Sequence, residues 1–322
     1  RIAQYHIVPA AFPTGWRLLR PPPARIVRRI PCSSRCGARF HLPGGGWFCS
    51  SIRRIGYAHY VMNKLGVTDI DVAVIVLASG SGTRLGEPVP KAAVKVGGKT
   101  LLHHALQGVH DSGVADMMVV TLPPNCSETC PQLYDDANRF GAMVSTGGDT
   151  RTASVVAAMR TVRAVCSLQQ ILPPRVVLIH DCARPFTPPR VYQRVLDELN
   201  TGSDAVIPVL PVVDTIKTVD AYGYVTGTPP RSQMRAVQTP QGFEWRVLEA
   251  AHRRSRRLPP EESEKITDDA MAVEAAGRRV VTVRGHMDAF KITTPMDLRI
   301  ARALYAAPDS SCLLYTSPSP RD

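Results

Sequence analysis

The hydrophobic residues of the chain fall into short continuous runs, separated by stretches with helical spacing. Val72 to Ala78 is an apolar run rich in β-branched residues and too short for a buried helix, so we predict a central strand of a parallel sheet. Similar runs predict strands over residues 116–122, 143–146, 175–181, 204–210 and 280–283.

Helical patterns lie between these runs. From Thr100 to His110 apolar residues recur every three or four positions, as on one face of a helix. Further helices are predicted over residues 128–140, 151–165, 243–257 and 295–304, after Pro188-Pro189, and from Thr267-Asp268-Asp269 onward. Strands that alternate with helices predict an α/β fold, with a doubly wound, mostly parallel sheet covered by helices on both faces.

One segment breaks the alternation. Residues 211–235 combine β-forming residues with a Tyr222-Gly223-Tyr224 turn and Pro229-Pro230. They predict a protruding β-arm that is too exposed to be stable by itself, because a two-stranded hairpin is at best marginally stable in water. The segment that follows, Gln238 to Phe243, is interpreted as a turn leading into the next helix.

The first strand is followed by a loop with the composition of a phosphate site. Gly80 and Gly82 let the backbone turn tightly and approach a ligand, and Arg84 and Lys91 add two cations. A dinucleotide loop is excluded because the third glycine comes one position late. The tetrad at residues 97–100 resembles the end of a P-loop but lacks its leading glycine.

The loop instead fits the pattern L-A-x-G-x-G-x-R followed by P-K, from Leu77 to Lys91. This pattern resembles the signature of nucleotidyltransferases that join a nucleoside monophosphate to a phosphorylated sugar or polyol. Two later motifs make the resemblance specific: GGDTR with Ser154, and HDCARP over residues 180–185. Together they resemble the 2-C-methyl-D-erythritol 4-phosphate cytidylyltransferase family of the non-mevalonate isoprenoid pathway, with motifs in order from about Val72 to Leu304.

The resemblance implies a Rossmann-like nucleotidyltransferase fold, CTP and a polyol phosphate as substrates, Mg²⁺ as cofactor, and a homodimer that exchanges its arms. It assigns nucleotide binding to Ala78, Ser79, Gly80, Gly82, Gly148, Asp149, Arg151, Ser154 and Asp181. It assigns the sugar phosphate to Arg184, Thr215, Lys217, Arg231 and Thr239, with Arg231 reaching into the neighbour's site. Asp181 is also the candidate for steering a metal ion that the CTP phosphates mainly hold.

The chemistry of this reaction needs cations more than bases. A phosphate oxygen attacks the α-phosphorus of CTP while pyrophosphate leaves, and that phosphate is already nucleophilic at neutral pH. Catalysis then consists of positioning two polyanions and neutralising their charge. The resemblance implies that Lys291, in the family's closing motif, faces the active site. We therefore predict that Arg84, Lys91 and Lys291 act on the triphosphate and on the charge developing at the α-phosphorus.

Two positions depart from the family pattern. Cys182 stands where the family usually has alanine, a small change that leaves the expected function unaltered. Asp269 stands where the family commonly has glutamate, in a T-D-E segment that opens a helix. Capping of that helix is enough to explain both Asp268 and Asp269.

The formal net charge of +12 suggests nucleic-acid binding, but its distribution argues against such a partner. Residues 1–61 contain ten arginines and no acid, so they leave only about +2 for the rest of the chain. We interpret residues 1–61 as upstream sequence translated in frame before Met62, with an organellar transit peptide as the alternative. Residues 312–322 are interpreted as an artefactual tail, which leaves 62–311 as the cytidylyltransferase domain.

The cysteines and histidines between residues 62 and 311 that were considered as metal ligands predict no metal site. Cys126, Cys130, Cys166 and Cys182 lack a complete metal-ligand spacing and are expected to be free thiols, and residues His103, His104 and His110 are expected to be structural or solvent-facing. No apolar run has membrane-spanning length. We expect a cytoplasmic protein, or a plastid one if the leader is a transit peptide.

Two alternative functions remain open. A ribitol 5-phosphate cytidylyltransferase would share the scaffold and differ at the residues that face the sugar. A non-catalytic nucleotide-binding protein would keep the fold without the activity. The second alternative predicts loss of cations, whereas Arg84, Lys91, Arg184 and Lys291 are all present.

Overall fold

The computed structural model describes residues 40–41, 47–48, 70–263 and 266–306. The chain divides into two compact units, residues 1–50 and 51–322. In the first unit, β1 (Phe40–His41) pairs antiparallel with β2 (Trp47–Phe48). Apart from these two strands, the predicted leader and tail lie outside the described residues, and so does Met62.

The second unit is built on an eight-stranded sheet with the spatial order β12-β9-β13-β8-β3-β6-β7 and with β14 beside β9. β12 and β13 run against the other strands, so the sheet is mostly parallel, as predicted. The strands are β3 (Val72–Leu77), β6 (Met117–Leu122), β7 (Met143–Thr146), β8 (Val176–Asp181), β9 (Ala205–Pro211), β12 (Arg235–Val237), β13 (Gln241–Glu244) and β14 (Val281–Arg284).

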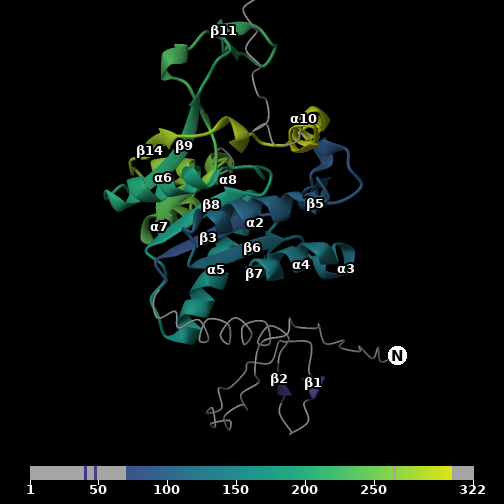
Figure 1. Cartoon of the computed structure of the whole chain (residues 1–322). Coiled ribbons are helices and arrows are strands. Elements are labelled where there is room, and N and C mark those ends of the chain that lie inside the picture. The colour runs from purple at the N-terminus through teal and green to yellow at the C-terminus, as the bar shows by residue number, and fades with distance from the viewer. Residues whose placement is uncertain (1–39, 42–46, 49–69, 264–265, 307–322) are drawn as a thin grey trace, which may run out of the picture. The chain divides into compact units, whose positions relative to one another are not determined.

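Helices lie on both faces of this sheet (Figure 1). The α-helices are α2 (Leu101–Ser112), α3 (Cys126–Thr129), α4 (Pro131–Arg139), α5 (Arg151–Gln169), α6 (Pro189–Asn200), α7 (Trp245–Ser255), α8 (Pro260–Ser263), α9 (Asp269–Ala275) and α10 (Pro295–Ala306). Shorter elements are the 3₁₀ turns η1 (Thr83–Leu85), η2 (Lys91–Ala93), η3 (Arg231–Gln233) and η4 (Met287–Ala289), and the strands β4 (Lys95–Val96) and β5 (Lys99–Thr100).

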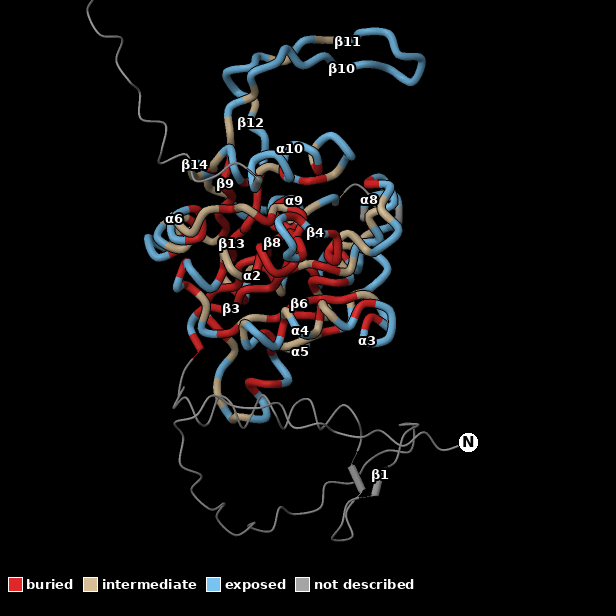
Figure 2. The backbone as a smooth tube through the Cα atoms, turned by 45° about the vertical axis from the view of Figure 1, so that its right-hand side comes forward, coloured by how far each residue is buried: buried red, intermediate tan, exposed pale blue. Residues whose placement is uncertain are grey.

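The central strand β3 is buried on both faces, which explains the continuous apolar run that predicted it. Successive side chains of a strand point to opposite faces. Val74 and Val76 pack in one core with residues of α2, α4 and α6. Ala73 and Ile75 pack in a second core with residues of α5, α7 and α9. The buried centre of the sheet is red in Figure 2.

Two details of the sequence prediction are wrong. The helix predicted over 128–140 is split into α3 and α4, because Pro131 lacks the N–H that a continuous helix requires and instead begins α4. The turn predicted over 238–243 contains β13, which lies antiparallel between β8 and β9. Its sequence Q-G-F-E is too short and too polar to show a strand pattern.

The arm predicted over residues 211–235 is a hairpin. β10 (Thr218–Val219) pairs antiparallel with β11 (Val225–Gly227), and Asp220 accepts hydrogen bonds from the N–H groups of Tyr222 and Tyr224 in the turn. The arm projects from the sheet (Figures 1 and 2), with Tyr222 87% and Tyr224 74% exposed. The predicted arm is therefore present, and its apolar side chains lack cover within the described chain.

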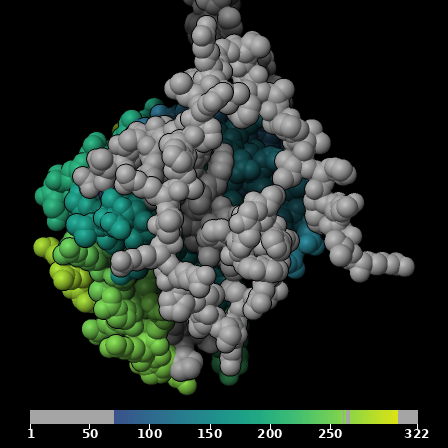
Figure 3. Space-filling model, turned by 90° about the horizontal axis from the view of Figure 1, so that it is seen from below, coloured from purple at the N-terminus to yellow at the C-terminus, as the bar shows by residue number. Residues whose placement is uncertain are grey.

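The strand order also groups the C-terminal half of the unit. β9, β13 and β14 lie on the same side of β8, away from β6 and β7. Figure 3, a view from below, shows the green to yellow C-terminal segments gathered beside the teal middle of the chain.

Gly242 in β13 is where α6 approaches the sheet closely. An added Cβ would lie 2.4 Å from Val195 Cγ1, 2.7 Å from Leu199 Cδ1 and 2.8 Å from Leu178 Cδ2. We expect Gly242→Ala to lower the free energy of unfolding by about 1–3 kcal/mol, measured by urea denaturation, because this core must shift to admit a methyl group. In the control Gly80→Ala, the added Cβ meets no atom within 4 Å, so the change should stay below about 0.5 kcal/mol. Equal stability of the two variants would contradict this account of the packing.

Candidate active site

The predicted site residues gather at the carboxyl edge of the parallel strands. β3 and β8 are neighbours, with Leu77 paired to Asp181 at their ends. β6 and β7 end together in the same direction, with Leu122 paired to Thr146. The loops that leave these ends carry the glycine-rich segment, the GGDTR segment and the HDCARP segment. This is the edge at which open α/β sheets bind ligands.

The glycine-rich loop folds back onto Lys91. Gly82 has a φ of 70°, and an added Cβ there would lie 2.5 Å from the Cβ of Lys91. Only glycine adopts this backbone conformation at no steric cost and leaves room for the lysine. Leu85 of η1 is buried in a cluster with residues of α10, and this packing anchors the loop. The neighbouring Arg84 is exposed.

Lys91, Arg84 and Lys291 form a cluster of cations. Burial lowers the pKa of Lys91, and the positive charges of Lys291 and Arg84 lower it further, while Cys182 and Asp181 act in the opposite direction. Such mutual effects require that these groups lie near one another. The structure thus brings together the three cations that the sequence assigned to the triphosphate.

Asp181 is the acid that pairs with one cation of this cluster, Lys291, and with Arg151. Its Oδ2 accepts a hydrogen bond from Nζ of Lys291 at 2.7 Å, and its Oδ1 lies 3.4 Å from Nε of Arg151. Burial alone would raise the pKa of Asp181, but Arg151 and Lys291 outweigh that effect and hold the pKa well below its usual range. The carboxylate is therefore ionised and already paired with two cations.

Thr239 and His180 hold the end of β8. The Thr239 hydroxyl accepts a hydrogen bond from the N–H of Asp181 at 3.1 Å and lies 3.1 Å from Nδ1 of His180. Burial lowers the pKa of His180 to about 4, so its ring is neutral. With Nε2 donating to the carbonyl of Arg184, Nδ1 is left to accept the proton of the threonine hydroxyl. Thr239, predicted to bind substrate, is buried and engaged with the protein.

Arg184, also predicted to bind substrate, ties three loops together. Its guanidinium donates to the carbonyl oxygens of Ala289 at 2.6 Å and Val237 at 3.0 Å. The N–H of Ile292 in turn donates to the carbonyl of Ala183. The HDCARP loop therefore fixes the segment that carries Lys291.

The residues predicted to read the nucleotide base lie on two adjoining loops. The hydroxyl of Ser79 lies 3.0 Å from that of Ser154, which accepts the N–H of Gly148 at 3.1 Å. Ala78 is fixed by donating its N–H to Thr121, and Asp149 is exposed. A Cβ at Gly147 would lie 2.3 Å from the Cβ of Ser79, so the loops meet only because this residue is glycine.

The role of Asp269 was not predicted from the sequence. Only Asp268 caps α9, by accepting the N–H of Met271. The side chain of Asp269 is 0% exposed and accepts a 2.5 Å hydrogen bond from Nη1 of Arg151. Capping therefore does not explain both acids. The only available signals were a second acid directly after the capping Asp268 and the arginine of GGDTR, and no local pattern connects these two residues.

The arm residues predicted to bind substrate stay on the arm. Lys217 donates to Thr228 at 2.7 Å, and Arg231 donates to the carbonyl of Val213 at 2.7 Å. Thr215 is exposed. The structure does not bring these residues together with the cation cluster, and their assignment stays a prediction.

The histidines are structural or solvent-facing, as predicted. His103 and His104 are buried, with Nδ1 of His103 2.9 Å from Asp136 and Nε2 of His104 2.9 Å from the carbonyl of Val96, whereas His110 is exposed. The described cysteines are free, and no described group of three or more His, Cys, Asp or Glu could hold a metal ion.

Within the described ranges, no helix has the length and apolar character needed to cross a membrane.

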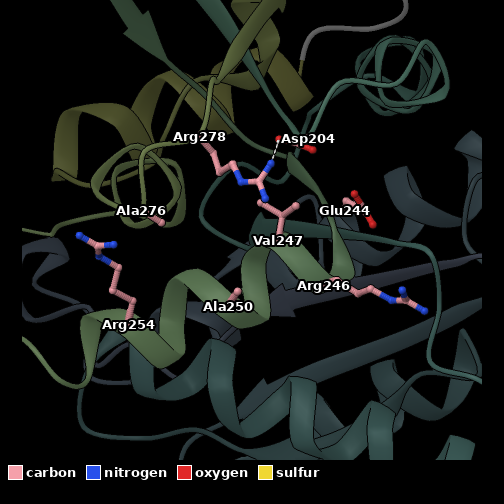
Figure 4. A pocket seen from close by; sticks show the side chains of 8 residues that line it. All are labelled: Asp204, Glu244, Arg246, Val247, Ala250, Arg254, Ala276 and Arg278. Carbon is pink, nitrogen blue, oxygen red and sulfur yellow. Dashed lines mark hydrogen bonds and ion pairs between the residues drawn. The ribbon is translucent and has the colours of Figure 1, made fainter.

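A cavity of about 400 Å³ lies away from this cluster (Figure 4). Asp204, which precedes β9, and Glu244, which ends the antiparallel β13, both line it, so it lies at the opposite edge of the sheet. Arg246 and Arg254 point in different directions and Arg278 donates to Asp204, so the cations do not converge on a common point. The cavity contains none of the predicted site residues.

Comparison with known proteins agrees with this geometry. The family model described as IspD, 2-C-methyl-D-erythritol 4-phosphate cytidylyltransferase, matches residues 72–306. A curated relative with that name from Rhodococcus jostii (strain RHA1) is 46% identical over 233 residues, which is 72% of this chain and 94% of the relative. One from Nocardia farcinica (strain IFM 10152) is 43% identical over 236 residues, covering 73% and 94% of the two chains.

Solved structures agree as well. The crystal structure of 2-C-methyl-D-erythritol 4-phosphate cytidylyltransferase from Thermus thermophilus has a TM-score of 0.57 and 36% identity, and covers 74% of this chain and 100% of its own. The Francisella tularensis enzyme has a TM-score of 0.56 and 27% identity, covering 72% of this chain and 99% of its own. The chain therefore belongs to the 2-C-methyl-D-erythritol 4-phosphate cytidylyltransferase family.

Proposed function

We propose that this protein transfers the cytidylyl group of CTP to 2-C-methyl-D-erythritol 4-phosphate in isoprenoid precursor biosynthesis. The products are 4-diphosphocytidyl-2-C-methyl-D-erythritol and pyrophosphate. Family membership supports this proposal, and the observation that carries it is the group of cations in which Lys91 lies near Arg84 and Lys291 and Lys291 pairs with Asp181. A site that joins two polyanions needs this excess of positive charge.

The proposed reaction is an in-line displacement. A phosphate oxygen of the acceptor forms a bond to the α-phosphorus of CTP, and the bond from that phosphorus to the bridging oxygen breaks. Pyrophosphate leaves with the electron pair. Because the acceptor phosphate is ionised at neutral pH, no residue has to remove a proton. Arg84, Lys91 and Lys291 neutralise the triphosphate and the charge that develops at the α-phosphorus.

The two adjoining loops are assigned to the nucleotide. The backbone of Gly80 and Gly82 would follow the phosphates, and Ala78, Ser79, Gly148, Asp149 and Ser154 would surround the cytosine. The part-buried hydroxyls of Ser79 and Ser154 and the N–H of Gly148 already form one connected group, which supports this assignment. Arg151 begins α5 directly after the second loop, and its Nε lies 3.4 Å from Asp181 Oδ1.

Mg²⁺ fits this site as an ion that arrives with the nucleotide. Asp181 is a hard oxygen donor of the kind Mg²⁺ prefers, but the described residues near it supply no further carboxylate cage. Asp181 would therefore hold the ion together with the CTP phosphates. When bound, Mg²⁺ polarises the phosphoryl oxygens. The residues of the chain supply the remaining neutralisation.

The substrate polyol is assigned to Arg184, Thr239 and the arm. We propose that the protein is a homodimer in which Thr215, Lys217 and Arg231 of one subunit complete the site of the other. The exposed apolar residues of the arm support an assembly that covers them. We further place the protein in the cytoplasm, a reducing compartment that suits the four cysteines of the described part of the chain, which are buried and free. Residues 62–311 carry the activity in this proposal.

Lys91→Ala tests the cation mechanism. We expect turnover to fall by about 10²-fold or more while the fold is retained, because a charge that stabilises the transition state is lost. The measurement is pyrophosphate release, with circular dichroism to confirm folding. Lys95→Ala is the matched control, since Lys95 is exposed on β4 and assigned no role. Near-normal turnover of Lys91→Ala would remove Lys91 from the mechanism.

Substrate preference tests the function itself. CTP should be preferred over UTP and ATP by about 10²-fold or more in kcat/KM, because a site that hydrogen-bonds one base leaves polar groups unpaired with another. The assay offers methylerythritol phosphate and ribitol 5-phosphate in parallel. Faster reaction with ribitol 5-phosphate would replace the proposed acceptor. CTP binding without pyrophosphate release from either acceptor would indicate a non-catalytic protein.

Mixing two inactive variants tests the exchanged arm. A dimer of one Lys91→Ala chain and one Arg231→Ala chain would hold one site with both residues intact. Refolding the two variants together should therefore restore about a quarter of the wild-type activity, since half of the dimers are mixed and half of their sites are complete. Activity no higher than that of the separate variants would show that Arg231 acts within its own chain or not at all.

A further inference from the structure

Arg151 is shared by two acids from distant parts of the chain. It begins α5, where its Nη1 donates to Asp269 Oδ2 at 2.5 Å and its Nε lies 3.4 Å from Asp181 Oδ1. Asp181 ends β8 and Asp269 begins α9. A guanidinium is a planar fork that can bridge two carboxylates in a fixed orientation, which an ammonium cannot.

Asp269 is the more deeply buried of the two acids. Its side chain is 0% exposed, and a buried charge of this kind is tolerated only when it is paired. Its second partner is His252 on α7, whose Nε2 lies 3.1 Å from Asp269 Oδ1 and whose side chain is 3% exposed. Asp269 thus connects α5, α7 and α9 at a point behind the nucleotide loops.

The contacts continue into the cation cluster. Asp181 Oδ2 accepts a hydrogen bond from Lys291 Nζ at 2.7 Å. Acids and cations alternate along the series Asp269, Arg151, Asp181 and Lys291, so each charge restrains the next. Loss of the charge on Asp269 would free Arg151 to turn fully onto Asp181, where it would compete with Lys291.

We propose that Asp269 is a positioning residue, which holds Arg151 and through it Asp181 and Lys291 in the arrangement that receives the nucleotide. Asp269 itself touches no substrate in this proposal. The inference rests on the proposed function, because CTP is the nucleotide whose binding it affects.

Asp269→Asn is the first test, since it removes the charge and keeps the shape. The affinity for CTP, measured by calorimetry without acceptor, should fall by about tenfold, whereas the KM for the polyol phosphate should change little. Asp269→Glu, which retains the charge, should recover part of the loss. Glu249→Gln is the matched control, because Glu249 lies on α7 near His252 but pairs with Arg163 and Arg253 at the surface. CTP affinity of Asp269→Asn within twofold of wild type would overturn the proposal.

A double-mutant cycle separates positioning from a general loss of stability. If Asp269 acts through Arg151, the variant Arg151→Met with Asp269→Asn should bind CTP no more weakly than Arg151→Met alone. Losses that multiply in the double variant would show that the two residues act independently, and would overturn the proposal.

A second variant keeps the test valid if Asp269→Asn does not fold. His252 lines a cavity of about 200 Å³, which gives room for His252→Phe to remove one partner of Asp269 without overpacking. A loss of CTP affinity of about threefold is expected, and unchanged affinity would count against the proposal.

The positions of Arg151, Asp181 and Lys291 can also be tested directly, without measuring enzyme activity. In a crystal structure of the folded variant, Arg151 should leave its place between the two acids and the bond from Lys291 to Asp181 should lengthen. An unchanged Arg151, Asp181 and Lys291 arrangement would overturn the proposal. If the unsubstituted chain binds no CTP, the proposed function fails, and this crystallographic result still decides the inference.

Discussion

The site depends on one buried carboxylate that two cations share. Asp181 ends a central strand, where burial would neutralise an isolated acid, yet Arg151 and Lys291 keep it ionised. Lys291 is 110 residues away along the chain, so this contact holds the end of β8 against the C-terminal loop. Without it, two positive side chains would face each other across an open edge of the sheet, and their repulsion would spread them apart.

The pairing of Asp181 with Arg151 and Lys291 also explains how the cations of the site are held in place before a ligand binds. Before any triphosphate arrives, Asp181 is a partner for both Arg151 and Lys291, and a more highly charged anion can replace it at Lys291. Lys91 and Arg84 are less engaged, and burial already makes the charge on Lys91 costly. When a polyphosphate binds, these four cations are therefore already positioned, and their charge is only partly neutralised by the protein. Arg184 connects the supporting segments by donating to the backbone carbonyl oxygens of Ala289 and Val237, so its charge is not neutralised by a carboxylate in these contacts.

Local patterns in the sequence were enough for most strands, most helices and the glycine-rich loop, whereas Lys291 was assigned by resemblance to the family. β3 and β8 are buried on both faces, so each appears as a continuous apolar run, and Gly82 marks a position where both the backbone and Lys91 require glycine. Asp269 could not be predicted in this way. Its neighbours in sequence justify a cap, whereas its partner Arg151 is 118 residues away, and burial arises only when α5, α7 and α9 pack together. β13 was missed for a similar reason, since tertiary pairing with β8 and β9 makes a strand of four residues that show no strand pattern.

The place of β13 has a consequence for how the protein is made. β8 and β9 are not neighbours in the sheet, and β13 fills the space between them. During synthesis the first half, from β3 to β8, can pair as it leaves the ribosome. β9 cannot join this first half of the sheet until residues 241–244 follow, after the entire arm has been synthesised. The second half must therefore assemble in a late step that closes long loops, with the arm already exposed to solvent.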